Sequence, residues 1–195
     1  MQGLDFIEDS TWEEVFANWR ADEAEQPSWQ ECARKKGWDN WESWRNYAAD
    51  RLSLSRKKWR LYEVQSPQDF IPEMLVGPFK SWQQHLKEEQ INELTFAEYV
   101  ELESKRLSTN NKIVSLLWRF PRETQLIALR RPDRDQLTCF EGTHRSLTTA
   151  VAKKHGIALP ASIKVRLAVA NLIDDDLEIL KSMAKGGTEK PDHLR

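Results

Sequence analysis

Cysteine and long hydrophobic runs are both scarce in this chain, and each absence excludes a class of protein. Of the 195 residues only Cys32 and Cys139 are cysteines, and they form no CxxC or metal-ligand spacing. A framework of disulfides is therefore excluded, which is typical of a reducing compartment. No stretch approaches the roughly 20 apolar residues of a membrane-spanning helix, and the N-terminus lacks the basic and apolar regions of a secretory signal. We expect a cytoplasmic protein that does not contact a membrane.

An excess of charge of one sign is missing as well. The chain has 29 Lys and Arg against 31 Asp and Glu, which gives a formal net charge of −2. Proteins that coat nucleic acid carry a surplus of Lys and Arg. The overall charge therefore does not favour nucleic acid as a partner, although a local basic face stays possible.

Tryptophan, in contrast, is abundant near the N-terminus. Six of the nine tryptophans lie between Trp12 and Trp44. Capping boxes, in which a cap residue stands three positions before Glu, mark helix starts here; they are Ser10/Glu13, Ser28/Glu31 and Asp39/Glu42. We expect helices over residues 11–23, 29–36 and 40–53, within a Trp-rich helical subdomain of residues 1–55. Aromatic residues at helical spacing usually pack in a core, and the alternative is a surface for a protein partner or for stacking nucleic acid.

From Arg56 onward the sequence predicts strands mixed with helices. Strands are expected over residues 58–64, 125–130, 136–140 and 163–169, and helices over residues 81–89, 95–105, 111–120, 145–154 and 174–184. The strand, helix and strand from 136 to 169 are consistent with a crossover onto a parallel neighbour. We expect one α+β domain over residues 56–185 and a flexible tail over residues 186–195.

A polar corner stands between the strand at 136–140 and the helix that follows. The first turn of a helix presents free N–H groups and attracts anions such as phosphate. Gly142 allows a ligand to approach the backbone, and Thr143, His144 and Arg145 supply donors. Glu141 could bind a metal ion or accept a proton. The alternative is an ordinary helix start, with Thr143 as the N-cap and Glu141 and Arg145 solvated.

The motif FEGTHR at this corner resembles the ParB/sulfiredoxin superfamily. Sulfiredoxins carry Phe-Gly-Gly-Cys-His-Arg here, ParB partition proteins a Gly-Glu-Arg-Arg version, and ParB-like free serine kinases Asp-Gly-His-His-Arg. Gly142, His144 and Arg145 match, and Glu141 stands where the kinases have Asp. The resemblance covers about residues 124–170 and not the Trp-rich segment. It implies a small mixed sheet with flanking helices.

The resemblance also implies a ligand. In the family this loop holds nucleotide phosphates, so Gly142, Thr143, His144 and Arg145 would contact ATP or another NTP. Mg²⁺ would bridge the phosphates, with Glu141 as its ligand, and Glu141 and His144 would be the catalytic pair. Thr143 replaces the nucleophilic cysteine of sulfiredoxins, so sulfinic-acid repair is not implied.

Three functions follow from this. The first is phosphoryl transfer from a nucleotide to a small hydroxyl compound, or hydrolysis of the nucleotide. The second is a nuclease or DNA-backbone-binding effector related to ParB-like plasmid proteins, and the third is a catalytically idle interaction protein. Four arginines near the corner either add phosphate contacts or are solvated charges: Arg119, Arg122, Arg130 and Arg131. Whether the protein is an enzyme stays open at this point.

Overall fold

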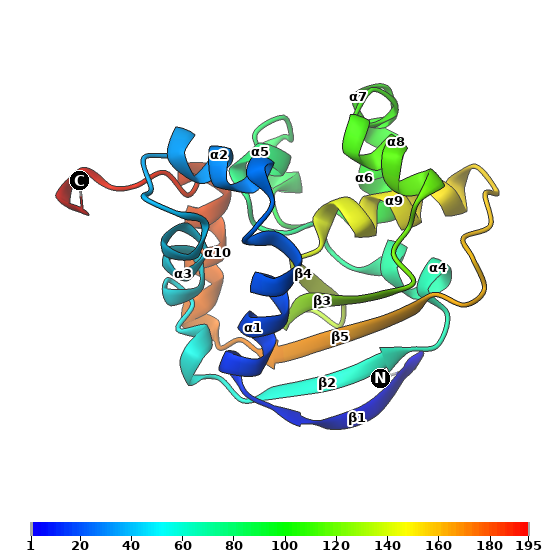
Figure 1. The fold of residues 1–195 in the computed structure, drawn as a ribbon, viewed down its shortest axis with the longest axis horizontal. Coiled ribbons are helices and arrows are strands. Elements are labelled where there is room, and N and C mark those ends of the chain that lie inside the picture. Colours follow the sequence, from blue (N-terminus) through cyan, green and yellow to red (C-terminus); the bar gives the residue numbers. More distant parts are fainter. Residues whose placement is uncertain (1, 195) are drawn as a thin grey trace.

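A five-stranded mixed sheet forms the centre of the fold (Figure 1). The computed structural model describes residues 2–194, and the strand order within them is β1-β2-β5-β3-β4. The strands are β1 (Leu4–Ser10), β2 (Trp59–Val64), β3 (Glu123–Arg130), β4 (Leu137–Glu141) and β5 (Lys164–Asn171). β3 and β5 are parallel, and the other neighbours are antiparallel. The α+β class that the sequence predicts is confirmed.

Helices connect the strands and cover the sheet. They are α1 (Trp12–Glu23), α2 (Pro27–Lys35), α3 (Trp41–Asp50), α4 (Pro67–Phe70), α5 (Lys80–Gln83), α6 (Phe96–Leu102), α7 (Ser104–Ser108), α8 (Asn111–Trp118), α9 (Thr143–Lys154) and α10 (Asp174–Gly186). Short 3₁₀ turns cover Leu54–Arg56, Ile71–Glu73, Glu88–Gln90 and Asp192–Leu194. Within residues 2–194, no helix has the length and apolar character that a membrane crossing requires.

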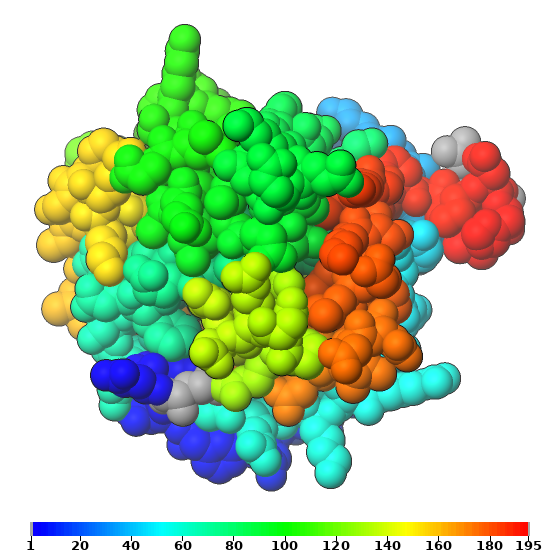
Figure 2. All heavy atoms as spheres, turned by 180° about the vertical axis from the view of Figure 1, so that it is seen from behind, coloured from blue at the N-terminus to red at the C-terminus, as the bar shows by residue number. Residues whose placement is uncertain are grey.

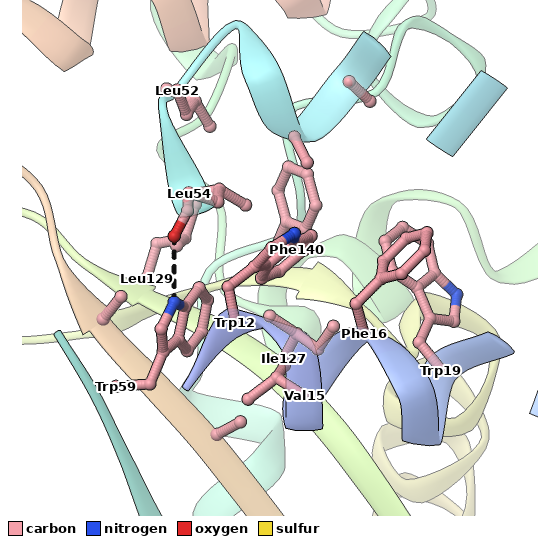
Figure 3. Packing of buried hydrophobic residues seen from close by; sticks show 14 of the residues in the cluster. Trp12, Val15, Phe16, Trp19, Leu52, Leu54, Trp59, Ile127, Leu129 and Phe140 are labelled. Carbon is pink, nitrogen blue, oxygen red and sulfur yellow. Dashed lines mark hydrogen bonds between the residues drawn. The ribbon is translucent and has the colours of Figure 1, made fainter. Parts of the chain in front are cut away.

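The strands bury side chains on both faces, because successive residues of a strand point to opposite sides. In β3, Ile127 and Leu129 pack against α1, α3 and α10, whereas Leu126 and Ala128 pack against α6, α8 and α9. The sheet therefore lies between two helical layers, each with its own apolar core. The first core is the tryptophan-rich one (Figure 3).

The packing interpretation is confirmed for five of the six N-terminal tryptophans, whereas Trp29 is only partly buried. Trp12, Trp19, Trp38, Trp41 and Trp44 are all buried, with Trp41 completely enclosed. Their rings meet one another and the sheet, and the Trp19 ring lies 6.0 Å from that of Phe140 on β4. These indoles form the core between the helices and the sheet and are not available to an outside partner.

The helix starts are close to those predicted, but the caps differ by a residue. Thr11, not Ser10, caps α1 and forms the capping box with Glu14. Asn40, not Asp39, caps α3 by accepting from the Ser43 N–H. The capping box expected at Ser28 does not form, because α2 already begins at Pro27. Proline suits the first position of a helix, since the N–H that it lacks would have no helical acceptor there.

The expected helix over residues 81–89 is broken into α5 and a 3₁₀ turn. The buried Gln83 side chain donates to the Gly77 carbonyl at 2.9 Å and accepts from the Asn92 N–H at 3.0 Å. This side chain therefore fastens a loop, and the helix does not continue.

The predicted crossover is wrong in its pairing. β5 is parallel to β3, which lies between it and β4, so β4 and β5 run in opposite directions. The outer edge of β4 is already occupied, since the Leu75 N–H bonds to the Leu137 carbonyl at 2.8 Å and the Cys139 N–H to the Leu75 carbonyl at 2.9 Å. Helix α9 therefore carries the chain past β3 to its far side.

The boundary expected near residue 55 does not separate two cores. β1, which the sequence analysis missed, pairs with β2 along the lower edge of the sheet in Figure 1. All but one of its side chains are at least partly exposed, so it lacks the alternation that marks a half-buried strand. α1 then packs directly on the sheet, and the N-terminal helices and the sheet share one core.

The expected tail is anchored at its start. The Thr188 carbonyl accepts from the Trp38 indole at 2.8 Å, and its hydroxyl accepts from the Trp44 indole at 2.8 Å. Seen from behind, α10 in orange lies beside the yellow-green β3–β4 turn and the green region of α6 and α7 (Figure 2). α10 and the residues just after it therefore belong to the packed body of the protein.

Candidate functional site

The polar corner lies where β4 ends and α9 begins. Gly142 has φ +99°, and a Cβ added there would lie 2.2 Å from Leu126 Cδ2, so only glycine fits. α9 starts at Thr143, two residues earlier than predicted, and its N-cap is Gly142 instead of Thr143. No side chain caps this first turn in the described chain. The N–H groups of Thr143, His144 and Arg145 therefore have no intrahelical acceptor.

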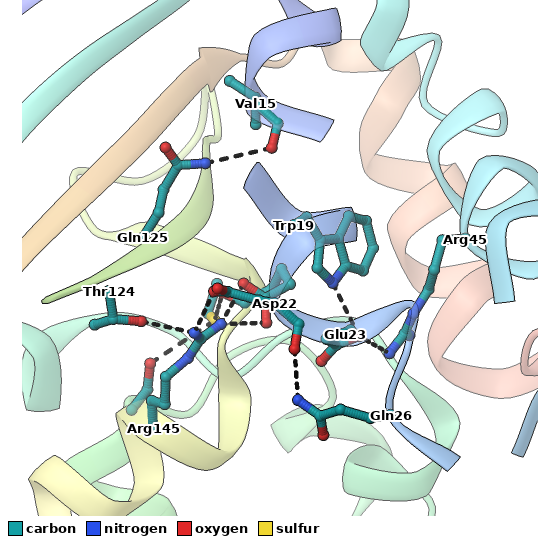
Figure 4. Close-up of polar contacts among 12 residues, drawn as sticks. Val15, Trp19, Asp22, Glu23, Gln26, Arg45, Thr124, Gln125 and Arg145 are labelled. Carbon is teal, nitrogen blue, oxygen red and sulfur yellow. Dashed lines mark hydrogen bonds and ion pairs between the residues drawn. The ribbon is translucent and has the colours of Figure 1, made fainter. Parts of the chain in front are cut away.

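Arg145 is held by an internal ion pair. Its Nη2 donates to both carboxylate oxygens of Glu141, at 2.5 and 2.7 Å, and its Nη1 donates to Thr124 Oγ1 at 2.6 Å and Asp22 Oδ2 at 3.1 Å. Figure 4 shows this guanidinium between β3, α1 and the corner. Both side chains are largely buried, with 14% of Arg145 and 7% of Glu141 exposed. Glu141 and Arg145 of the motif therefore bind each other.

The carboxyl group of Glu141 has a pKa close to neutral pH. Burial raises its pKa to about 7, and the Arg145 guanidinium opposes that shift by stabilising the carboxylate. The neighbouring carboxylates of Glu23 and Asp22 raise the pKa further. Each of the two Glu141 oxygens accepts one hydrogen bond from Arg145.

His144 is enclosed by aromatic rings. Its ring meets Trp82 at 5.1 Å and Trp29 at 6.1 Å, both edge to face. Burial lowers its pKa to about 4, and the nearby Lys112 ammonium lowers it further. His144 is therefore neutral at pH 7 and presents an uncharged imidazole beside the helix N-terminus.

A second buried pair, absent from the sequence prediction, lies next to the first. Arg45 Nη2 donates to Glu23 Oε2 at 2.7 Å, and the indoles of Trp19 and Trp41 donate to the same oxygen at 3.0 and 3.1 Å. Four indole rings surround the Arg45 guanidinium; its distance is 4.0 Å to Trp44, 5.0 Å to Trp19 and Trp29, and 5.9 Å to Trp41. Burial opposes ionisation of Glu23, but Arg45 and the indoles outweigh it and lower the pKa of Glu23.

A cavity of about 590 Å³ opens beside the corner, between the N-terminal helices on one side and α8 and α9 on the other. Its size is within the roughly 300–1,000 Å³ range of small-molecule sites. Gly142, Thr143, His144 and Arg145 all line it. The four residues predicted to contact a nucleotide thus lie together at this cavity, and their contact with a ligand stays a prediction.

Cations reach this cavity from α8 and from the segment that follows it. Lys112 and Arg119 line it, and neither forms an ion pair within residues 2–194. Lys112 Nζ lies 4.0 Å from the ring centre of Trp29, and partial burial lowers the pKa of this ammonium. Two further lining groups are buried donors that find no acceptor in the described chain, Trp29 Nε1 and Arg45 Nε. Counting the whole lining, six Lys and Arg stand against four Asp and Glu, a small cationic excess that is compatible with an anionic ligand.

A larger hollow of about 1030 Å³ lies elsewhere, at the carboxyl ends of β3 and β5, and basic side chains line it too, including Lys58 and Arg130. Arg131, one of its cations, pairs with Asp133 at 2.7 Å, and another, Lys57, pairs with Asp176 at 2.6 Å. Of the four arginines singled out in the sequence, only Arg119 lines the cavity beside the corner, while Arg130 and Arg131 line the larger hollow.

Two other predicted roles can be placed. Cys139 is fully buried, and burial raises the pKa of its thiol to about 12, so it packs as an apolar residue, as the sequence suggests. Over residues 2–194 there is no group of three or more His, Cys, Asp or Glu side chains placed to hold a metal ion.

Comparison of the chain with protein-family models, with curated protein sequences and with solved structures finds no match. The resemblance of the corner to the ParB/sulfiredoxin superfamily accordingly stays a prediction from the motif.

Proposed function

We propose that the protein binds the phosphates of a nucleotide, ATP or a related NTP, in the cavity beside the α9 N-terminus. One observation supports this most directly: uncapped N–H groups of a helix start and two cations without ion-pair partners line the same cavity. A helix N-terminus attracts phosphate through its free N–H groups and its partial positive charge. The aromatic side chains of the cavity supply the apolar lining typical of a site for a ring-containing ligand.

The proposed reaction is transfer of the terminal phosphoryl group to a small hydroxyl compound or to water. Catalysis of such reactions rests mainly on positioning and on stabilising the charge of the phosphates. Lysine, arginine and backbone N–H groups do both. A carboxyl with a pKa near 7 is suited to accept the proton of the attacking hydroxyl, and each Glu141 oxygen keeps a second lone pair beside its hydrogen bond from Arg145.

The roles of the motif residues differ from those implied by the resemblance. Arg145 is a positioning residue in this proposal, because its guanidinium already binds Glu141 and Thr124. His144 orients the ligand as a neutral hydrogen-bonding group. No protein ligand is assigned to Mg²⁺, which would enter with the phosphates it bridges.

Isothermal titration with ATP, ADP and CTP tests the proposal, each with and without Mg²⁺. We expect at least one nucleotide to bind with a Kd below 1 mM, which corresponds to a binding free energy of about −4 kcal/mol or stronger. Release of inorganic phosphate from the bound triphosphate should then slow at least tenfold in Glu141→Gln. If none of the three nucleotides binds, the proposal fails.

A further inference from the structure

One face of α8 points into the cavity. Lys112, Leu116 and Arg119 all line it, and they are separated by four and three residues, the spacing of side chains on one face of a helix. Arg119 follows directly after the last helical residue, Trp118. The two cations are separated by about 10 Å of helix rise along that face.

Lys112 occupies a position that an anion can readily take over. Its ammonium lies over Trp29 and carries three N–H donors, but no carboxylate in residues 2–194 lies within ion-pair distance of it. An anion entering the cavity would meet a cation that gives up only a ring contact, which is weak at a partly exposed site.

Arg145, unlike Lys112, is already bound to other side chains. It donates four hydrogen bonds to three side chains, and its departure would leave the buried Glu141 without its counter-ion. Removing one partner of a buried ion pair is strongly destabilising. A ligand that recruited Arg145 would have to offset that loss, whereas Lys112 and Arg119 are available without it.

We infer that the phosphate chain is held by Lys112 and Arg119 of the α8 face together with the first-turn N–H groups of α9, and that Arg145 does not contact it. The inference rests on the proposed function and adds the residues that bind and the kind of phosphate bound. Two cations so far apart on one helix face match a chain of two or three phosphates better than a single phosphate ion.

Titration of inorganic pyrophosphate, tripolyphosphate and ADP into the full-length protein at low salt, without Mg²⁺, tests this. The variants are Lys112→Met, Arg119→Gln and Lys112→Arg, and the control is Lys105→Met, which removes an exposed lysine on α7 outside the cavity. We expect Lys112→Met and Arg119→Gln each to weaken binding at least tenfold, Lys112→Arg to restore most of it, and the control to stay within twofold of the original chain. Thermal unfolding of each variant within a few degrees of the original chain shows that the fold is kept.

The outcomes separate the two proposals. Unchanged affinity in both Lys112→Met and Arg119→Gln would overturn the inference while leaving nucleotide binding intact. Binding of pyrophosphate or tripolyphosphate but of no nucleotide, lost in the two variants, would support the inference and remove the proposed function. If the original chain binds none of these anions, the inference fails, and the proposed function fails as well if ATP and CTP with Mg²⁺ do not bind either.

Discussion

Two buried arginine–glutamate pairs lie side by side in this protein, and they are built differently. Glu23 accepts three hydrogen bonds at one oxygen, from Arg45 and two indoles, and its pKa is lowered in spite of burial. Glu141 accepts only from Arg145, and its pKa is raised to about 7. Burial is the largest influence on the pKa of both carboxyls; Arg45 and the indoles outweigh it at Glu23, whereas Arg145 does not outweigh it at Glu141.

The two ion pairs also differ in what surrounds their arginines. Indole rings surround Arg45 on several sides, so that pair stabilises the core between the helices and the sheet. Both pairs line the cavity, but only Arg145 also lies at the uncapped start of α9. The pair with the raised carboxyl pKa at the helix start is where we expect chemistry, since strongly shifted pKa values gather at functional sites.

Removing the arginine of each pair should give the largest effect. We expect Arg45→Met to lower the free energy of unfolding by about 3–5 kcal/mol, because it leaves Glu23 buried without its cation. Arg145→Met should cost less at pH 6 than at pH 8, because Glu141, which already titrates near 7, becomes protonated and neutral. Urea unfolding at both pH values measures this. Equal costs in the two variants at pH 6 would contradict the distinction.

The corner itself can be tested at its glycine. Gly142→Ala combines a positive φ with a Cβ too close to Leu126, and we expect a loss of about 2–3 kcal/mol. Gly186→Ala is the matched control, since a Cβ there meets nothing within 4 Å. The control should be neutral within about 0.5 kcal/mol or slightly stabilising. Unfolding curves in urea compare the two, and similar values would show that the corner is not constrained as described.

The role of the indole donors can be isolated with a pair of tryptophan variants. Trp41→Phe removes a donor to Glu23, whereas Trp12→Phe removes an indole that donates no hydrogen bond within residues 2–194. We expect Trp41→Phe to cost about 1–2 kcal/mol more, the range for leaving a buried charged group short of a donor. Differential scanning calorimetry at pH 7 measures the difference, and no difference would mean that the Arg45 charge alone keeps Glu23 ionised.

The effect of His144 should be visible only in the pH dependence of stability. Its pKa falls from 6.5 to about 4 on folding, so the unfolded chain takes up a proton in that interval and the folded chain does not. Stability should therefore decrease as the pH falls from 6.5 towards 4, and His144→Gln should flatten this slope. The exposed His155→Gln serves as the control. An unchanged slope in His144→Gln would mean that His144 is not held neutral.

The sequence predicts local features well here. The helices of the N-terminal segment, the tryptophan core and the strand-to-helix corner all follow from spacing and cap residues, because these signals depend on neighbours within one or two turns. The corner also supplies the one motif, FEGTHR, that directs attention to the cavity.

Contacts between distant segments could not be predicted in this way. Glu23 and Arg45 lie on different helices, and Lys112 reaches Trp29 across the cavity, so no periodicity in the sequence relates them. Likewise β1 shows no alternation, because it has little burial on either face. The ion pair between Arg145 and Glu141 forms in a buried environment, and the motif alone does not reveal that pairing.

Backbone amide NMR during titration with ADP or pyrophosphate tests the central claim most directly. The account predicts that the largest shifts fall on the N–H groups of Thr143, His144 and Arg145 and on α8 near Lys112, while the first turn of α10, at Asp174 and Asp175, stays unchanged. Saturating binding that leaves the amides of the first α9 turn unshifted would contradict it.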